Sequence, residues 1–377
     1  MNAKLSLGKR ICFTCVMLIF VAACAEGLAW FAMRHYFPKY EVIRQVLLGE
    51  TSGLAQFQKA VGQPYLLYTP APTVPDHNEQ GYRGKAVPMR RRPGYARVLC
   101  LGGSTTYSWC VEKASEAYPA VLERLLNEMK PEGVEGVEVI NGGLPSGTTA
   151  ELLTHYLFKF HYFKPDLVLI NTGCNDIHAA LRSYYQPDYS HYRQTLQTPQ
   201  PLGRKARLLL HSRFISLIVI DLFRSDAVAK DPLIREDFPP PTRWYPECAR
   251  RECGDAPIPD ADLAFLHNLE ALIAEIQRDG GKVVTMAFRE CPPTDPNYKK
   301  LYQYTPREKD ELERNRALLR RCSEERNILY LPFPAEIISA GNWADYAHLN
   351  AAGCAEKAAY AAPTVAETLW PGSTSGK

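Results

Sequence analysis

Two patterns of hydrophobic and polar positions divide this chain. Residues 11–33, ICFTCVMLIFVAACAEGLAWFAM, carry no charge except at Glu26. From about residue 97, short apolar runs that end in glycine or a polar residue alternate with longer segments in which apolar residues recur every three to four positions. The first pattern is long enough for a helix that spans a bilayer. The second predicts strands and helices that follow one another in one domain.

The second pattern predicts a parallel sheet of five buried strands. A helix between the first two strands is expected over residues 118–130, and another begins near residue 148 with a capping box formed by Thr148 and Glu151. Strands that alternate with helices form parallel sheets covered on both faces, and functional side chains gather at the carboxyl ends of the strands. The expected strands are ARVLCLGG (96–103), VEVINGG (137–143), PDLVLINTG (165–173), GKVVTMAF (281–288) and NILYLPF (327–333).

Several interpretations of the N-terminal span are open. A signal anchor over residues 11–33 is favoured, because the apolar run continues past any cleavage point. VAAC, residues 21–24, resembles a lipobox, which would make Cys24 the lipidated first residue. The span could also be a cleaved secretory peptide or a buried core helix. We expect the body of the protein to lie outside the cytoplasm. The basic residues that flank the span are nearly balanced, with Lys4, Lys9 and Arg10 before it and Arg34, Lys39 and Arg44 after it.

The remaining organisation follows from changes in composition. We expect a short basic N-terminus at 1–10, a Pro-rich lead-in at 34–96 and one domain at 97–370. A long insertion at about 180–260, rich in Tyr, Pro and Arg, is expected to form a cap beside the active site. Its apolar stretch, 213–223, is expected to be a packed helix rather than a membrane contact. Four tyrosines at the start of the insertion suit sugar stacking and simple packing equally well: Tyr184, Tyr185, Tyr189 and Tyr192.

Composition narrows the classes of partner. The 377 residues carry a net charge of only +3, so there is no overall basic field that would attract nucleic acid. The arginine-rich run 89–97 is expected to be a solvated approach to the first strand, with contact to an anionic surface as the alternative. Cys248 and Cys253 are close enough to pair in an oxidising compartment. Neither paired CxxC motifs nor HExxH occurs, so we expect no metal site and no cofactor.

The glycine turn after the first strand carries the first candidate for chemistry. In GGSTTY, residues 102–107, a nucleotide-binding turn would need GxxxxGK[ST] or GxGxxG, and the turn fits neither. Ser104 is therefore either a helix N-cap or an exposed nucleophile.

Three other strand ends favour the nucleophile. NGGLPSGTTAE follows the second strand and offers backbone N–H groups, and NTGCND follows the third strand with Asn175 and Asp176. NWADYAHLNAAG follows the fifth strand and places Asp345 three residues before His348. This spacing lets the carboxylate hold one ring nitrogen while the other faces a serine. Asp176 is expected to be a structural hydrogen-bonding residue.

These blocks, in this order over about residues 97–370, resemble those of the SGNH or GDSL-type hydrolases. GGSTT resembles the GDS block with Ser104 as nucleophile, GCND the block that contributes Asn175, and DYAH the block with Asp345 and His348. Two departures are present. Gly103 replaces the usual aspartate of the first block. In NGGLPSGTT the glycine lies one position late, so either Gly147 or Ser146 is the expected oxyanion donor. NEQGYRG and the leading span resemble exported bacterial members.

The resemblance implies a fold and a reaction. The fold is a flavodoxin-like α/β three-layer sandwich with a five-stranded parallel sheet. In the implied reaction His348 deprotonates Ser104, Asp345 orients His348, and backbone N–H groups with the Asn175 amide bind the oxyanion. The expected function is a serine esterase with an acyl substrate such as an O-acetyl group on a glycan. The alternatives are a polysaccharide O-acyltransferase and an inactive binding or assembly protein, and the intact Ser104, Asp345 and His348 argue against the latter.

Overall fold

The structure is a computed structural model that describes residues 6–36, 44, 60–182, 185–192, 209–222, 263–298 and 304–372. It divides into two compact units. One contains Met1–Gln58 and Gln194–Asp237, and the other contains Lys59–Arg193 and Phe238–Lys377. The second unit, the body of the protein, carries the predicted sheet.

Each of the five apolar runs forms a strand of one parallel sheet, in the order β4-β3-β5-β6-β7. This is the flavodoxin-like order. The prediction of a five-stranded parallel sheet is therefore confirmed. The strands are β3 (Tyr95–Gly102), β4 (Gly136–Gly143), β5 (Leu167–Thr172), β6 (Lys282–Ala287) and β7 (Leu329–Leu331).

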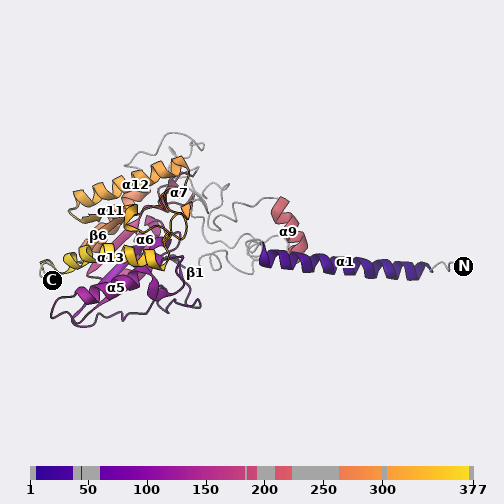
Figure 1. The fold of residues 1–377 in the computed structure, drawn as a ribbon, viewed down its shortest axis with the longest axis horizontal. Coiled ribbons are helices and arrows are strands. Elements are labelled where there is room, and N and C mark those ends of the chain that lie inside the picture. Colours follow the sequence, from indigo (N-terminus) through magenta and orange to yellow (C-terminus); the bar gives the residue numbers. More distant parts are fainter. Residues whose placement is uncertain are drawn as a thin grey trace. The chain divides into compact units, whose positions relative to one another are not determined.

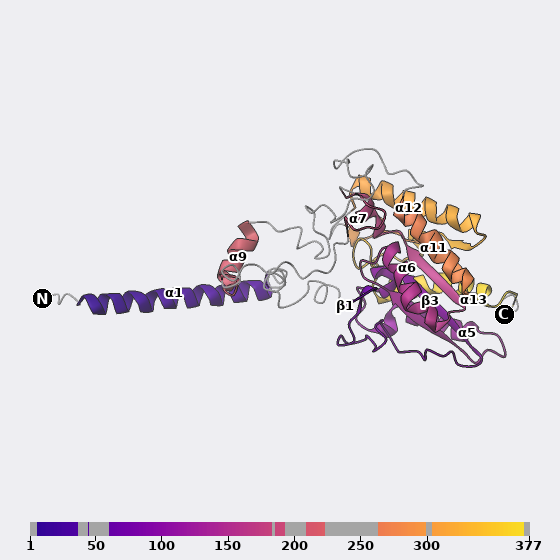
Figure 2. The same ribbon diagram turned by 180° about the vertical axis from the view of Figure 1, so that it is seen from behind.

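Helices cover both faces of the sheet and complete three layers (Figures 1 and 2). Alternate residues of each strand point to opposite faces. Val98 and Cys100 of β3 lie in the core cluster beneath α5 and α13. The helices of that layer are α5 (Tyr118–Met129) and α13 (Ala351–Leu369); those of the other layer are α6 (Thr149–Phe158), α11 (Ala264–Arg278) and α12 (Pro306–Glu325).

The capping box predicted for α6 is present. The Glu151 side chain accepts the N–H of Thr148, which is the N-cap residue. Short helical turns complete the body at α4 (Ser104–Tyr107), η1 (Ala114–Glu116), η2 (Phe160–Phe163), α7 (Asp176–Ala180) and η5 (Ala335–Ile337).

The described part of the expected lead-in packs against the body. A hairpin of β1 (Ala60–Gln63) and β2 (Leu67–Pro70) precedes a loop that carries Arg83. The buried Arg83 guanidinium donates to four backbone carbonyl oxygens between Tyr107 and Glu112, which belong to the segment directly after Ser104. The second half of the lead-in therefore holds the segment after Ser104 in place.

The expectation that Arg97 is solvated is wrong. Its side chain is 0% exposed and donates to Glu138 Oε2 through Nε at 3.0 Å and through Nη2 at 2.6 Å. Arg97 and Glu138 are register partners on β3 and β4, which explains the pairing. A charged residue at the start of a strand does not by itself reveal whether water or a buried carboxylate will solvate it.

The tyrosines of the insertion pack rather than face an open groove. Tyr185, Tyr189 and Tyr192 are buried, and the Tyr189 hydroxyl donates to Asp176 at 2.9 Å. The sugar-stacking alternative is therefore contradicted for these three. Tyr184 lies outside the described residues, as do Cys248 and Cys253. The described cysteines are free thiols.

Two buried histidines predict how stability responds to acid. His155 Nε2 lies 2.9 Å from the Leu66 carbonyl oxygen, and His191 Nε2 lies 2.9 Å from that of Ala179. Burial lowers the pKa of each histidine to about 4. Unfolded histidine titrates near 6.5, so unfolding takes up protons between these values, and the free energy of unfolding falls as pH drops from about 6.5 to 4. Each histidine contributes on the order of 3 kcal/mol to this fall. Burial also raises the pKa of Asp176 to about 6, which offsets part of it.

Unfolding of the detergent-solubilised chain, followed across this pH range, measures the effect. His155→Gln retains an N–H donor for Leu66 without a titratable ring. We expect this variant to show a clearly smaller loss of stability between pH 6.5 and 4 than the parent chain. An unchanged pH dependence would show that His155 is not neutral in the folded state.

Candidate active site

The turn that leads into Ser104 requires two glycines. A Cβ at Gly102 would lie 2.2 Å from Thr106 Oγ1 and 2.3 Å from the Asn171 carbonyl oxygen, and one at Gly103 would lie 2.5 Å from Asn175 Nδ2. The chain therefore passes from β3 into α4 with no room for a side chain, and Ser104 is the first residue of α4. This explains why Gly103 replaces the aspartate of the first block: Asn175 occupies the space that a side chain at position 103 would need.

Ser104, His348 and Asp345 form one continuous hydrogen-bonded chain. Ser104 Oγ lies 2.7 Å from His348 Nε2, and His348 Nδ1 lies 2.7 Å from Asp345 Oδ2. The carboxylate can only accept from Nδ1–H, so Nε2 carries the lone pair that accepts the serine proton. The structure thus brings together residues 244 positions apart in the order that proton abstraction needs.

The Asp345 carboxylate is held by its own loop. Its Oδ1 accepts the backbone N–H groups of Ala347 and His348, both at 2.8 Å. Burial alone would raise the pKa of Asp345, but the hydrogen bonds and the charge of His348, together with these two N–H groups, outweigh it and lower the pKa to about 2. Asp345 is therefore ionised at neutral pH.

Asn175 reaches the same side of Ser104 from the end of β5. It is the N-cap residue of α7, and its Nδ2 donates to the Gly147 carbonyl oxygen at 2.8 Å. Asn175, Gly147 and Ser104 line one small pocket together with Gly103. The side-chain amide thus lies in the same pocket as Ser104.

The two candidates for the second-block donor differ in backbone conformation. The Gly147 N–H donates to the Leu144 carbonyl oxygen at 2.8 Å, within a turn. Ser146 has a φ of 59°, the left-handed conformation that glycine adopts most easily. Ser146 therefore adopts a backbone conformation that favours glycine, one residue before Gly147.

Asp176 has the structural role expected for it. Its buried carboxylate accepts from the backbone N–H of Thr149 at 3.1 Å and from the Thr149 hydroxyl at 2.6 Å. These bonds join the start of α7 to the start of α6, which fixes the loop that carries Asn175 relative to the second block.

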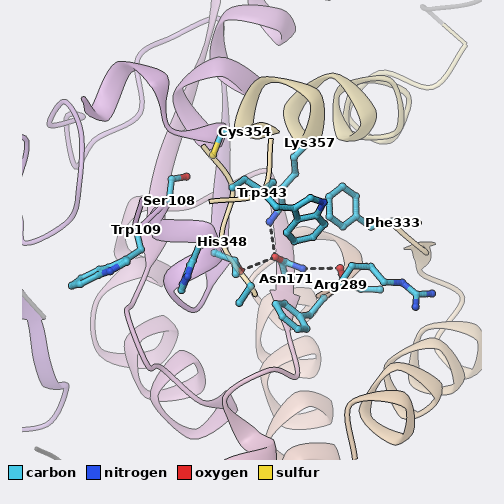
Figure 3. A pocket seen from close by; sticks show the side chains of 14 residues that line it. Ser108, Trp109, Asn171, Arg289, Phe333, Trp343, His348, Cys354 and Lys357 are labelled. Carbon is cyan, nitrogen blue, oxygen red and sulfur yellow. Dashed lines mark hydrogen bonds between the residues drawn. The ribbon is translucent and has the colours of Figure 1, made fainter. Parts of the chain in front are cut away.

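A buried lysine behind the triad was not predicted. Lys357 is 2% exposed, donates to Asn171 Oδ1 at 2.7 Å and lies over the Tyr118 ring at 4.4 Å from its centroid. Thr105, the residue after the nucleophile, donates to the same oxygen at 3.2 Å. Burial lowers the pKa of Lys357 to about 8. Figure 3 shows Asn171 at the centre of this network, with Lys357, Trp343 and His348 around it. Position 357 lies in an alanine-rich helix, so the sequence carries no signal for it.

Cys110 was also not anticipated. Its Sγ lies 3.7 Å from Asp345 Oδ2, a long, weak hydrogen bond from the thiol. Cys110, Asp345 and His348 offer three possible ligand atoms within 4.8 Å of one another. Asp345 and His348 already bind each other, and His348 also binds Ser104, so a cation held there would compete with these hydrogen bonds. The expectation of no metal site stays a prediction.

The fold and this site define a serine hydrolase built on a flavodoxin-like parallel sheet. Residues 100–355 match the model of the GDSL-like lipase/acylhydrolase family. The chain belongs to this family and is an ester hydrolase. No curated protein matches it.

Solved structures show similarity at low identity. An acetylxylan esterase from Geobacillus stearothermophilus is 15% identical, with a TM-score of 0.40, over 75% of this chain and 97% of that one. A protein described as an arylesterase from Agrobacterium tumefaciens is 16% identical, with a TM-score of 0.39, over 72% and 99%. A protein of the lipolytic G-D-S-L family from Desulfitobacterium hafniense is 14% identical, with a TM-score of 0.38, over 71% and 98%. At this level they carry no argument about substrate.

Proposed function

We propose that this chain is a membrane-anchored serine esterase that uses Ser104, His348 and Asp345 as its catalytic triad. The observation that carries the proposal is the hydrogen-bonded chain from Ser104 Oγ through both ring nitrogens of His348 to the Asp345 carboxylate. His348 takes the proton as Ser104 attacks the ester carbonyl, and then returns it to the departing alcohol. Asp345 stabilises the imidazolium that exists between these events. Water activated by His348 then releases the acid.

The oxyanion is held by three donors. We assign the backbone N–H of Ser104, the side-chain amide of Asn175 and a backbone N–H of the second block. Ser146, with its left-handed φ of 59°, is the candidate that we test for the third donor; the Gly147 N–H donates to the Leu144 carbonyl oxygen within its turn. Fixed donors aimed at the developing charge lower the barrier without reorganising during the reaction.

The substrate proposed is a short acyl ester, such as an O-acetyl group on a glycan. The same acyl-enzyme would yield an O-acyltransferase if a sugar hydroxyl replaced water. Hydrolysis of p-nitrophenyl acetate by the full chain tests the esterase, and oligosaccharide acceptors followed by mass spectrometry test transfer. No hydrolysis and no transfer by a folded preparation would refute both.

The anchor proposed is helix α1 (Leu7–His35), with the catalytic body outside the cytoplasm. This helix is long and apolar enough to cross a membrane, and none of its apolar window is buried. It continues without a break through Cys24, the residue at which lipoprotein processing would begin the mature chain. These features favour a retained anchor over a lipoprotein signal or a cleaved peptide.

The Asn175 amide has its own test. Asn175→Ala is expected to lower kcat for p-nitrophenyl acetate by about 10²- to 10³-fold with little change in KM, because the donor acts on the transition state. Asn175→Asp is the matched control, since it keeps the shape but replaces the amide donor with an acceptor, and it should lose at least as much. A folded variant of either kind with nearly unchanged kcat would remove Asn175 from the oxyanion site.

A further inference from the structure

The unit outside the catalytic body contains a second helix packed on the anchor. Helix α9 (Arg213–Leu222) belongs to the insertion between β5 and β6 and contacts the C-terminal half of α1 (Figures 1 and 2). Ala29 and Met33, four residues apart on α1, are buried, and so is Ser216 of α9. Small residues at such a contact are typical of helices that pack within membranes.

Glu26, the single charge in the apolar part of α1, caps the N-terminus of α9. Its Oε2 accepts the backbone N–H of Arg213 at 2.9 Å and its Oε1 that of Phe214 at 3.4 Å; Oε1 also accepts from the Ser212 hydroxyl. A carboxylate at this position satisfies N–H groups that the helix itself cannot and interacts favourably with the helix dipole. Glu26 therefore has polar partners supplied by α9.

The depth of Glu26 makes this pairing important. It lies 15 residues after Ile11, or about 22 Å along the helix, which places it within the last third of an apolar span about 30 Å thick. A carboxylate at such depth is costly unless it is paired. In this chain the partner is a helix terminus that must reach the same depth.

The opposite face of α9 is apolar and exposed. Phe214 is 43% and Ile218 is 42% exposed, and their spacing of four residues places them on one side of the helix. Leu209, just before the helix, is also exposed. The described stretch 209–218, LLHSRFISLI, carries only one formal charge, on Arg213. The face that Phe214 and Ile218 share thus matches acyl chains, and the outer surface of α1 beside it has the same character.

We propose that α9 is a second membrane-embedded element, docked on α1 through Glu26, with Phe214 and Ile218 inserted among the acyl chains of the leaflet at the C-terminal end of α1. The inference rests on the proposed anchoring by α1. The sequence predicts a packed helix here, and packing accounts for the buried face of α9 with Ser216. The proposal also accounts for the exposed face. The insertion leaves the body after Arg193, beyond α7 and the buried Tyr189, and the chain returns to the body at Phe238. The body is thus joined to the membrane both through the segment before β1 and through this insertion.

Site-specific photocrosslinking in the full chain tests the proposal. The chain is reconstituted into phosphatidylcholine vesicles with p-benzoyl-phenylalanine at position 214 or 218. Position 20 of α1 serves as the lipid-facing reference, and position 158, an exposed phenylalanine of the catalytic body, as the matched aqueous control. We expect lipid adducts at 214 and 218 in yields comparable to position 20, and none at 158. The proposal would be overturned if positions 214 and 218 formed adducts with a second copy of the chain. It would also be overturned if they formed no lipid adduct while position 20 did.

The Glu26 cap has a separate test. Glu26→Leu keeps α1 apolar but removes the acceptor for the start of α9, so the lipid adduct at 214 should fall about fivefold while that at position 20 is unchanged. An adduct at 214 that does not fall would overturn the role of Glu26. Absence of lipid adducts at position 20 itself would refute the anchor and the α9 proposal together. Hydrolysis of p-nitrophenyl acetate by the same preparations reports separately on the esterase.

Discussion

Ser104→Ala is expected to lower kcat for p-nitrophenyl acetate by about 10⁴- to 10⁶-fold. The variant loses the oxygen that lies 2.7 Å from His348 Nε2, so no acyl-enzyme can form, and only the oxyanion donors and substrate binding remain. The loss should appear in kcat and kcat/KM alike. Initial rates at saturating substrate, measured on purified full-length chain in detergent, are the readout.

The control for this prediction is the thermal stability of the variant, which shows whether it is folded. Ser104 begins a four-residue helix and is only partly buried, and alanine suits a helix, so Ser104→Ala should leave the thermal midpoint nearly unchanged. A matched variant, Ser146→Ala, retains the backbone N–H that we assign to the oxyanion and should keep most of the activity. Residual activity of Ser104→Ala near that of the parent chain would eliminate the serine mechanism.

Asp345→Asn is expected to lower kcat by about 10⁴-fold. The asparagine can still accept the N–H groups of Ala347 and His348 through Oδ1, so the loop should keep its geometry. Its amide would point a donor at His348 Nδ1, which forces the ring into the tautomer that places a proton on Nε2. That nitrogen could then no longer accept the proton of Ser104.

Steady-state kinetics across pH measure this effect. Loss of the carboxylate should reduce kcat far more than KM, and activity should rise toward alkaline pH as hydroxide replaces the missing base. Unfolding curves of the parent and the variant provide the structural control. A decrease smaller than about tenfold would mean that Asp345 only anchors its loop, and that His348 is oriented by another group.

Much of the site could be read from local sequence because strand ends and short loops are local features. Ser104 follows a buried strand and two glycines, and the spacing of Asp345 and His348 lies within one loop. The parallel sheet then brings these ends to one edge, as its connections require. The conformation of the second block was not accessible in this way, because the left-handed backbone at Ser146 and the bond from the Gly147 N–H to Leu144 arise in the folded turn.

Other features depend on partners distant in sequence. Arg97 is buried because Glu138 lies opposite it on the next strand. Lys357 is buried because Asn171 and the ring of Tyr118 receive its ammonium. The tyrosines near position 189 pack because Asp176 accepts the Tyr189 hydroxyl. In each case the side chain alone suits both solvent and interior, and burial follows only from the group placed beside it.

By itself the sequence determined the strands, the helices, the apolar N-terminal helix and the order of the blocks that carry Ser104, Asn175, Asp345 and His348, since hydrophobic periodicity and short-range spacing decide these within a few residues. Only the tertiary structure decided which polar groups meet. Hydrogen bonds of 2.7 Å tolerate almost no displacement, so the link from Ser104 to His348 and the pairing of Glu26 with α9 depend on the packing of elements far apart in the chain.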